Sequence, residues 1–219
     1  MTDISKPKRH PRPAATHTSR STAARAAHPL QATLAGLYPT LFGAQPRPLK
    51  RGIFQDLLAA HPDTLPSETL KAALSEHTRS GAYLNAVASG SHRYDLAGNP
   101  VEPVATEHVV HALLEVFRRR QNRSAQDLSP QLVQRLAAVY ETSGLSRDAF
   151  AALAPTRQER AQQWFDAALD MAAQHAAKSV ALRRAFGNSG LSLEAFASQY
   201  GLSLAEAQRV LAPAASAPH

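Results

Sequence analysis

Apolar residues recur every three or four positions along most of the chain, and this spacing predicts a mainly helical protein. The pattern begins near Pro29, a residue suited to the first turn of a helix. In the first part of the chain it predicts helices near residues 30–38, 49–58, 67–74, 82–88 and 106–120. Thr78 or Ser80 is placed to cap the helix near 82–88, and Thr106 to cap the long helix that ends on three arginines.

A different pattern interrupts these helices between residues 92 and 104. Polar and apolar residues alternate over 92–96, residues 97–100 read AGNP, and a second extended stretch follows over 101–104. Alternation on both sides of a turn containing Gly, Asn and Pro is typical of a β-hairpin. We therefore expect one small hairpin inside a helical domain.

The C-terminal part, residues 125–211, has a helical pattern throughout and contains a partial repeat. Residues 143–150 (SGLSRDAF) match residues 189–196 (SGLSLEAF). In each copy a Gly is placed to end one helix, and a Ser followed two residues later by an acid is placed to start the next. Glu206 stands in the capping-box position after Ser203. We expect a helical bundle or extension.

Charge and composition suggest four segments. The chain carries a net charge of +7, of which +5 lies in residues 1–29, a stretch rich in Pro, Ser, Thr, Ala, Arg and His. Such a stretch cannot bury enough apolar surface to fold, so a disordered basic tail is predicted over 1–28. Such a tail attracts polyanions without choosing among them. A domain over 29–121, a helical region over 122–212 and a frayed end over 213–219 complete the prediction.

Several classes of protein are disfavoured. No apolar run approaches the roughly 20 residues that a membrane span needs, so we expect a soluble, cytoplasmic protein without a membrane partner. The absence of cysteine excludes disulfides and thiolate chemistry. No G-x-S-x-G, phosphate-binding glycine loop or H-E-x-x-H is present, and the ten histidines are scattered. We therefore expect no enzymatic activity, cofactor or metal.

Two groups of polar residues are candidates for binding. Arg47, Lys50 and Arg51 stand before an apolar helix, where an ordinary solvated face is the alternative. The second group lies at the start of the short helix near 82–88. There, free backbone N–H groups and the hydroxyls of Thr78 and Ser80 would suit a phosphate.

Two further side chains are placed near that helix start. Tyr83 could stack on a nucleotide base or belong to the core. Arg93, on the predicted hairpin strand that faces the helix, could reach the same phosphate. Each of these observations is weak when taken alone.

Three motifs in this region resemble those of the ProQ/FinO family of bacterial RNA chaperones. Residues 47–57 (RPLKRGIFQDL) are similar to the family's R-P-L-K-x-G-I-x-x-D-L. Residues 73–84 (ALSEHTRSGAYL) are similar to A-L-x-x-x-T-x-x-x-x-Y-L, and residues 90–100 (GSHRYDLAGNP) to G-x-x-R-x-D-L-x-G-x-P. The resemblance covers about residues 30–120 and extends no further along the chain.

This resemblance implies a helical domain with a small hairpin that binds structured RNAs, including small RNAs and the 3′ ends of mRNAs. The typical ligand is a terminator-like hairpin with a single-stranded 3′ tail, and the implied role is post-transcriptional regulation by small RNAs. The implied phosphate contacts come from Arg47, Lys50 and Arg93, with Arg51 beside them. The terminal nucleotide would be surrounded by Thr78, Ser80 and Tyr83.

The remaining residues of the third motif, Asp95, Gly98 and Asn99, would shape the hairpin turn. Ala82 departs from the family pattern, because relatives often carry a basic residue there. Arg79, Lys71 or the basic tail would then supply more of the affinity.

Two alternatives concern the C-terminal helices. The A-x-x-x-G-L-S spacing after Phe196 resembles a helix-turn-helix, which would indicate a DNA-binding transcriptional regulator. However, the second helix of that pair offers few side chains able to read a major groove. The other alternative is a protein-interaction adaptor, in which the Ala-rich helices bind a partner or mediate self-association.

Overall fold

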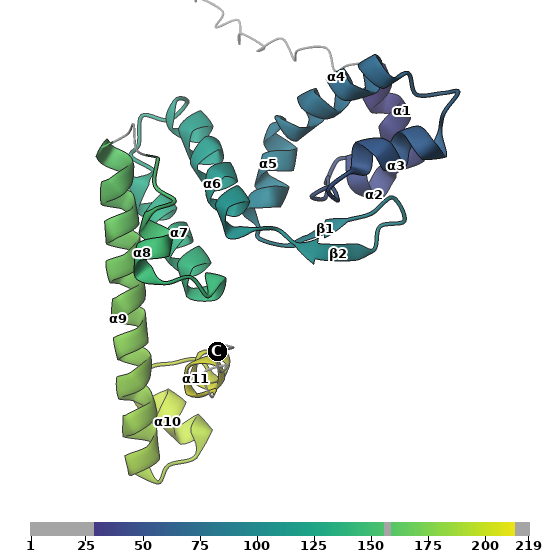
Figure 1. The fold of residues 1–219 in the computed structure, drawn as a ribbon. Helices are drawn as coiled ribbons and strands as arrows, with labels where there is room; N and C mark the ends of the chain where they lie inside the picture. The colour runs from purple at the N-terminus through teal and green to yellow at the C-terminus, as the bar shows by residue number, and fades with distance from the viewer. Residues whose placement is uncertain (1–28, 156–158, 213–219) are drawn as a thin grey trace, which may run out of the picture.

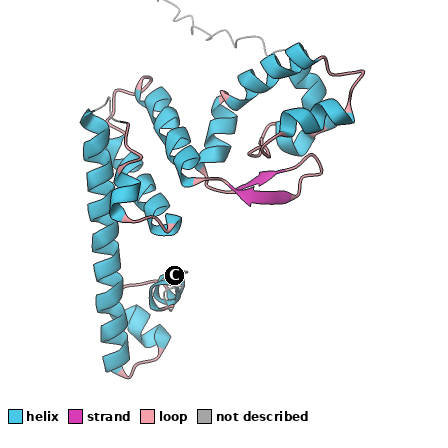
Figure 2. Ribbon diagram, in the orientation of Figure 1, coloured by secondary structure: helices cyan, strands magenta, loops and turns pink. Residues whose placement is uncertain are grey.

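The fold is helical with one small hairpin, as the sequence pattern predicts. The computed structural model describes residues 29–155 and 159–212, and this part holds eleven helices and two strands (Figures 1 and 2). The tail predicted over 1–28 and the frayed end predicted over 213–219 lie outside the described residues.

The first eight elements form the N-terminal part of the structure. They are α1 (Pro29–Leu37), α2 (Pro39–Phe42), α3 (Ile53–Ala60), α4 (Ser67–Thr78), α5 (Gly81–Ala88), β1 (His92–Tyr94), β2 (Pro100–Pro103) and α6 (Thr106–Gln121). β1 and β2 pair antiparallel, with an irregularity in register between Arg93 and Tyr94. The predicted hairpin is therefore confirmed.

The structure differs from the sequence pattern at three places. α2 has no counterpart among the predicted helices, because four residues are too few to show a helical period. α3 begins at Ile53 rather than near Leu49, since the backbone of 48–50 pairs with Tyr94 of β1 instead of turning into a helix. Thr106 is the first helical residue of α6 and not its cap; Ala105 occupies that position without a side-chain hydrogen bond.

The start of α5 is held by its own sequence. Ser80 has extended backbone angles, and its hydroxyl accepts a hydrogen bond from the backbone N–H of Tyr83 at 3.1 Å. Ser80, and not Thr78, is thus the cap. α6 then packs along α5, so the end of α6 lies beside the turn between α4 and α5 (Figure 1).

The C-terminal part consists of α7 (Ser129–Ser143), α8 (Arg147–Ala151), α9 (Glu159–Ser189), α10 (Leu193–Gln199) and α11 (Leu204–Leu211). α9 runs beside α7 and continues past it to α10 and α11 (Figure 1). The all-helical prediction for this part is confirmed.

The two copies of the SGLS repeat adopt the same turn. Gly144 and Gly190 both take left-handed backbone angles, with φ of 68° and 63°, which favour glycine. Ser146 and Ser192 each cap the helix that follows. The capping box of Ser203 with Glu206 is also formed, so the predicted helix starts are confirmed.

One hydrophobic core connects the N-terminal part with the first half of the C-terminal part. Phe117 of α6 contacts Trp164 of α9 with ring centroids 4.8 Å apart, and both pack against a buried cluster that runs from α1 to α9. The buried side chains at the far end of α9, α10 and α11 lie outside this cluster; they are Leu182, Phe196, Ala197 and Ala207. The division of the chain at residue 122 stays a prediction.

Candidate nucleic-acid interface

The turn between α4 and α5 presents an exposed helix start. Gly81 and Ala82 are exposed, and no hydrogen bond from their backbone N–H groups to the described residues is found. Unpaired N–H groups at a helix start carry partial positive charge, which suits an anion such as phosphate. The structure therefore offers the helix-start geometry expected from the sequence.

The side chains around this turn lie against their own backbone. The hydroxyl of Thr78 donates to the carbonyl of Leu74 at 2.9 Å, which leaves its oxygen able to accept. The Ser80 hydroxyl accepts from the N–H of Tyr83, so its proton remains available to a ligand. The exposed guanidinium of Arg79 donates to the carbonyl of Ser75 at 2.8 Å and lies along the last turn of α4.

Lys71 extends this surface along α4. It lines a hollow of about 420 Å³ between α3 and α4, together with Phe54 and Leu74. Lys71 and Thr78 are two helical turns apart, which places them on the same face of α4 at about 10 Å from one another. A polyanion lying along α4 can therefore meet both.

The group of Arg47, Lys50 and Arg51 forms a cationic loop, which we define as residues 47–51. The Arg47 guanidinium lies 4.7 Å from the centre of the Tyr94 ring. Lys50 forms an ion pair with Asp56 at 2.8 Å, and this hydrogen bond raises the pKa of Lys50. Arg51 stands 3.6 Å from Glu102. Two carboxylates thus offset part of the charge, while Arg47 keeps no acidic partner in the described structure.

Tyr83 and Arg93 lie deeper than the other predicted residues. Tyr83 is 6% exposed, and its hydroxyl accepts a hydrogen bond from the backbone N–H of Leu49 at 3.1 Å. Of the two alternatives for its ring, the structure bears out the core position: the ring is buried in the hydrophobic core. The Arg93 side chain is 13% exposed, and its Nη1 donates to the carbonyl of Leu49 at 3.0 Å. Its other polar contacts among the described residues are with His108 and Glu102, and not with Thr78 or Ser80.

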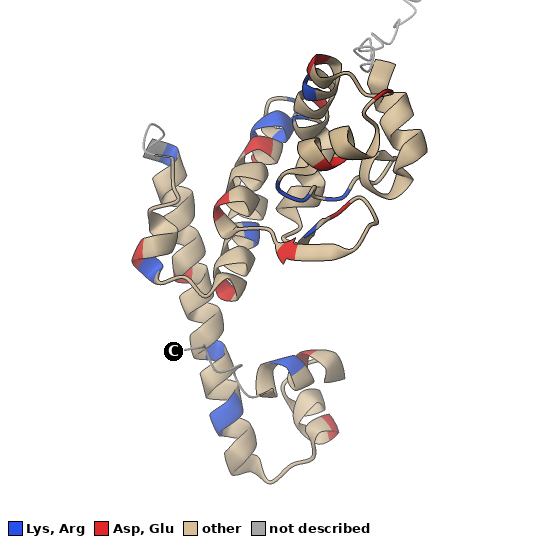
Figure 3. Cartoon of the chain, turned by 45° about the vertical axis from the view of Figure 1, so that its right-hand side comes forward, with Lys and Arg blue, Asp and Glu red and all other residues tan. Residues whose placement is uncertain are grey.

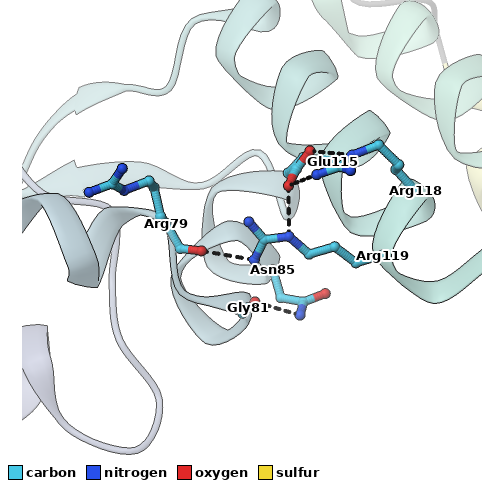
Figure 4. A network of polar contacts seen from close by, with 6 residues as sticks. All are labelled: Arg79, Gly81, Asn85, Glu115, Arg118 and Arg119. Carbon is cyan, nitrogen blue, oxygen red and sulfur yellow. Dashed lines mark hydrogen bonds and ion pairs between the residues drawn. The ribbon is translucent and has the colours of Figure 1, made fainter. Parts of the chain in front are cut away.

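Sequence reasoning missed the arginines at the end of α6. Arg119 donates from Nη1 to the backbone carbonyl of Arg79 at 2.8 Å, which joins α6 to the turn between α4 and α5 (Figure 4). The carboxylate of Glu115 forms ion pairs with both Arg118 and Arg119, with N–O distances of 2.8 and 2.7 Å. The hydrogen bond from Arg118, with the further contact from Arg119, lowers the pKa of Glu115 to about 2.

The same helix brings Arg120 next to α5. Its Nη2 lies 3.4 Å from the side-chain oxygen of Asn85, whose amide nitrogen donates to the carbonyl of Gly81 at 2.7 Å. From the sequence alone, Arg118, Arg119 and Arg120 indicated only that cations stand at the negative C-terminal end of a helix dipole. Their position beside the start of α5 follows from the packing of α6 on α5. This packing brings together residues about 40 positions apart in the sequence.

Lys and Arg residues thus occur in the cationic loop and β1, and at the end of α6 beside the turn between α4 and α5 (Figure 3). Among the described residues no group of three or more His, Asp and Glu is arranged to hold a metal ion. None of the helices described has both the length and the apolar character needed to cross a membrane.

Comparison with known proteins places this arrangement in a family. A family model described as the ProQ/FINO family matches residues 24–129. A crystal structure of a FinO-like RNA chaperone from Neisseria meningitidis is 32% identical, and the match covers 44% of this chain and 79% of that one, with a TM-score of 0.38. The chain belongs to the ProQ/FinO family.

The ProQ/FinO match contains all nine residues predicted for binding, and the motif resemblance seen in the sequence is confirmed. It ends at residue 129, where α7 begins. Apart from the first residue of α7, the helices α7 to α11 therefore lie beyond the matched ProQ/FinO region.

Proposed function

We propose that this ProQ/FinO protein is a non-catalytic RNA chaperone that binds structured RNAs, with a preference for a terminator-like hairpin that ends in a single-stranded 3′ tail. The observation that carries the proposal is the exposed start of α5. There, two unpaired N–H groups lie beside two hydroxyls, and the guanidinium of Arg79 lies along the preceding turn of α4, on a chain of this family.

Each part of the interface has a distinct task in this proposal. The N–H groups of Gly81 and Ala82 receive the phosphodiester that precedes the 3′-terminal nucleotide, and the hydroxyls of Thr78 and Ser80 lie within reach of the terminal ribose. Hydroxyl groups suit this task because the 2′- and 3′-hydroxyls of a ribose both donate and accept hydrogen bonds. Arg79 then contributes charge from the last turn of α4.

The cationic loop and the end of α6 meet the RNA backbone on either side. An A-form duplex is recognised mainly through its shape and its phosphates. Its recognition therefore requires positive charge at fixed positions and not side chains that read bases. Arg47 and Lys50 supply that charge on one side, and Arg119 and Arg120 on the other. The α6 arginines also supply cations where Ala82 does not.

The biological role follows from the ligand. A protein that holds the 3′ end of a hairpin shields that end and keeps the RNA available for pairing. This supports a part in post-transcriptional regulation by small RNAs. The relative from Neisseria meningitidis is itself described as a FinO-like RNA chaperone.

The test compares RNAs that differ only at their 3′ end. A hairpin with a free 3′-hydroxyl should bind the full chain at least tenfold more tightly than the same hairpin with a 3′-phosphate, and far more tightly than duplex DNA of equal length. Equal binding of all three would refute the terminal site.

Variants of the protein complete this test. Arg79→Ala should weaken binding and should lower the slope of log affinity against log salt by about 0.7–0.9, as expected for the loss of one phosphate contact. Arg147→Ala is the matched control. Arg147 is also exposed, but it lies on α8 and pairs with Asp170. It should leave both the affinity and the salt slope unchanged.

A further inference from the structure

The backbone of Leu49 lies in the middle of the cationic loop and is held from both sides by distant side chains. Its N–H donates to the hydroxyl of Tyr83, 34 residues further along the chain, at 3.1 Å. Its carbonyl accepts from Arg93, 44 residues further along, at 3.0 Å. Leu49 itself is 3% exposed, so neither backbone group can turn to water instead.

The peptides on either side of Leu49 are held as well. The carbonyl of Pro48 accepts from the N–H of Tyr94 at 2.8 Å, and the N–H of Lys50 donates to the carbonyl of Tyr94 at 2.9 Å. Four polar backbone groups in a row are therefore paired with partners outside the loop. A loop without regular secondary structure would otherwise keep much of its conformational freedom, which binding would have to remove.

Tyr83 and Arg93 both hold this loop through hydrogen bonds, and both are too buried to contact a ligand with much of their surface. The Tyr83 ring is 6% exposed and packs against His77, with ring centroids 5.1 Å apart. The Arg93 side chain is 13% exposed, and its second terminal nitrogen donates to His108 at 3.2 Å. Moving either side chain outward would break the hydrogen bond that fixes Leu49.

We infer that Tyr83 and Arg93 are positioning residues for the proposed RNA-binding activity. They fix the backbone of Leu49, so that the neighbouring Arg47 and Lys50 project from a preformed loop toward the phosphates of the RNA. This inference rests on the proposed function, because it assigns a reason for the rigidity of the loop. It differs from a direct role in that neither side chain contacts the nucleic acid.

The first measurement uses the full chain without RNA. Amide hydrogen exchange at Leu49, followed by NMR, should be at least tenfold faster in Tyr83→Phe than in the wild type, since the phenyl ring leaves the Leu49 N–H without an acceptor. Tyr140→Phe is the matched control, because Tyr140 is a half-buried tyrosine on α7, away from the loop. It should not change exchange at Leu49. Unchanged exchange in Tyr83→Phe would overturn the inference.

The second measurement is a double-mutant cycle for binding of the terminator hairpin. Tyr83→Phe should weaken binding about tenfold in the wild-type background but less than threefold in the background of Arg47→Gln with Lys50→Gln. The reason is that the loop then has few contacts left to lose. Equal loss in both backgrounds would show that Tyr83 acts on RNA directly, and this result would overturn the inference.

Arg93→Gln provides an independent variant in case Tyr83→Phe does not fold, and it should show the same dependence on the loop residues. The two proposals fail in different ways. If the wild type does not bind the hairpin at all, the proposed RNA-binding function is wrong. If the wild type binds but Leu49 exchange is unaffected, or the losses are additive, the function stands and the positioning role is wrong.

Discussion

The buried imidazole of His77 predicts that the protein loses stability in mild acid. His77 is the one buried polar side chain among the described residues, at 6% exposed. It lies between the rings of Phe42 and Tyr83, with centroids 4.8 and 5.1 Å away. Its Nε2 has no hydrogen-bond partner in the described structure. Burial disfavours the charged form and lowers the pKa of His77 from 6.5 to about 4.

The size and sign of the effect follow from this difference in pKa. Between pH 6.5 and pH 4 the unfolded chain binds a proton at His77 while the folded chain does not, so the free energy of unfolding falls as the pH is lowered through this range. Above pH 6.5 both states are neutral and the residue makes no pH-dependent contribution. The full difference amounts to about 3 kcal/mol. That is a large part of the roughly 5–15 kcal/mol by which a domain is usually stable.

The assay is urea unfolding followed by circular dichroism at several pH values from 7.5 to 4. The wild type is compared with His77→Phe, which keeps a ring in the core but cannot bind a proton. The free-energy difference between the two proteins should change by about 3 kcal/mol in favour of the variant as the pH falls. The exposed His111, changed to Asn, serves as the control and should follow the wild type. Parallel curves for the wild type and His77→Phe would refute the reasoning.

Three further predictions concern the cap, the α6 arginines and the distal core. Ser80→Ala should lower the free energy of unfolding in urea by about 1 kcal/mol and should also weaken hairpin binding. Ser146→Ala removes the equivalent cap of α8 and should leave binding unchanged, so equal binding by both variants would contradict the site at α5. Glu115→Gln removes the carboxylate that Arg118 and Arg119 share, so the affinity for the hairpin at low salt should rise about threefold in a filter-binding assay. Weaker binding would show that the ion pairs are needed to place Arg119. Phe150→Ala should destabilise the main core by about 3–5 kcal/mol. Phe196→Ala should instead speed hydrogen exchange only over residues 182–211, which form the far end of α9 with α10 and α11, and a loss of protection in α1–α8 would contradict a separate distal core.

The sequence alone determined the features that depend on neighbours within a few residues. The helix starts at Ser80, Ser146 and Ser203, the left-handed glycines of the SGLS repeat and the hairpin turn were all readable as patterns. The reason is that caps and turns are closed by hydrogen bonds between residues two to four positions apart. The three motifs within residues 47–100 also identified the family, because their order and spacing together are specific.

The tertiary structure decided which candidate side chains are buried and which are exposed. Tyr83 and Arg93 were predicted to touch RNA but are largely buried, and both hold the backbone of Leu49. Leu49, predicted as helical, pairs with β1 instead. Arg119 gained a place beside the α5 start only through the packing of α6. These contacts join residues about 34–45 positions apart, and no local pattern of hydrophobic and polar residues encodes them, because they form only when the helices pack on a common core.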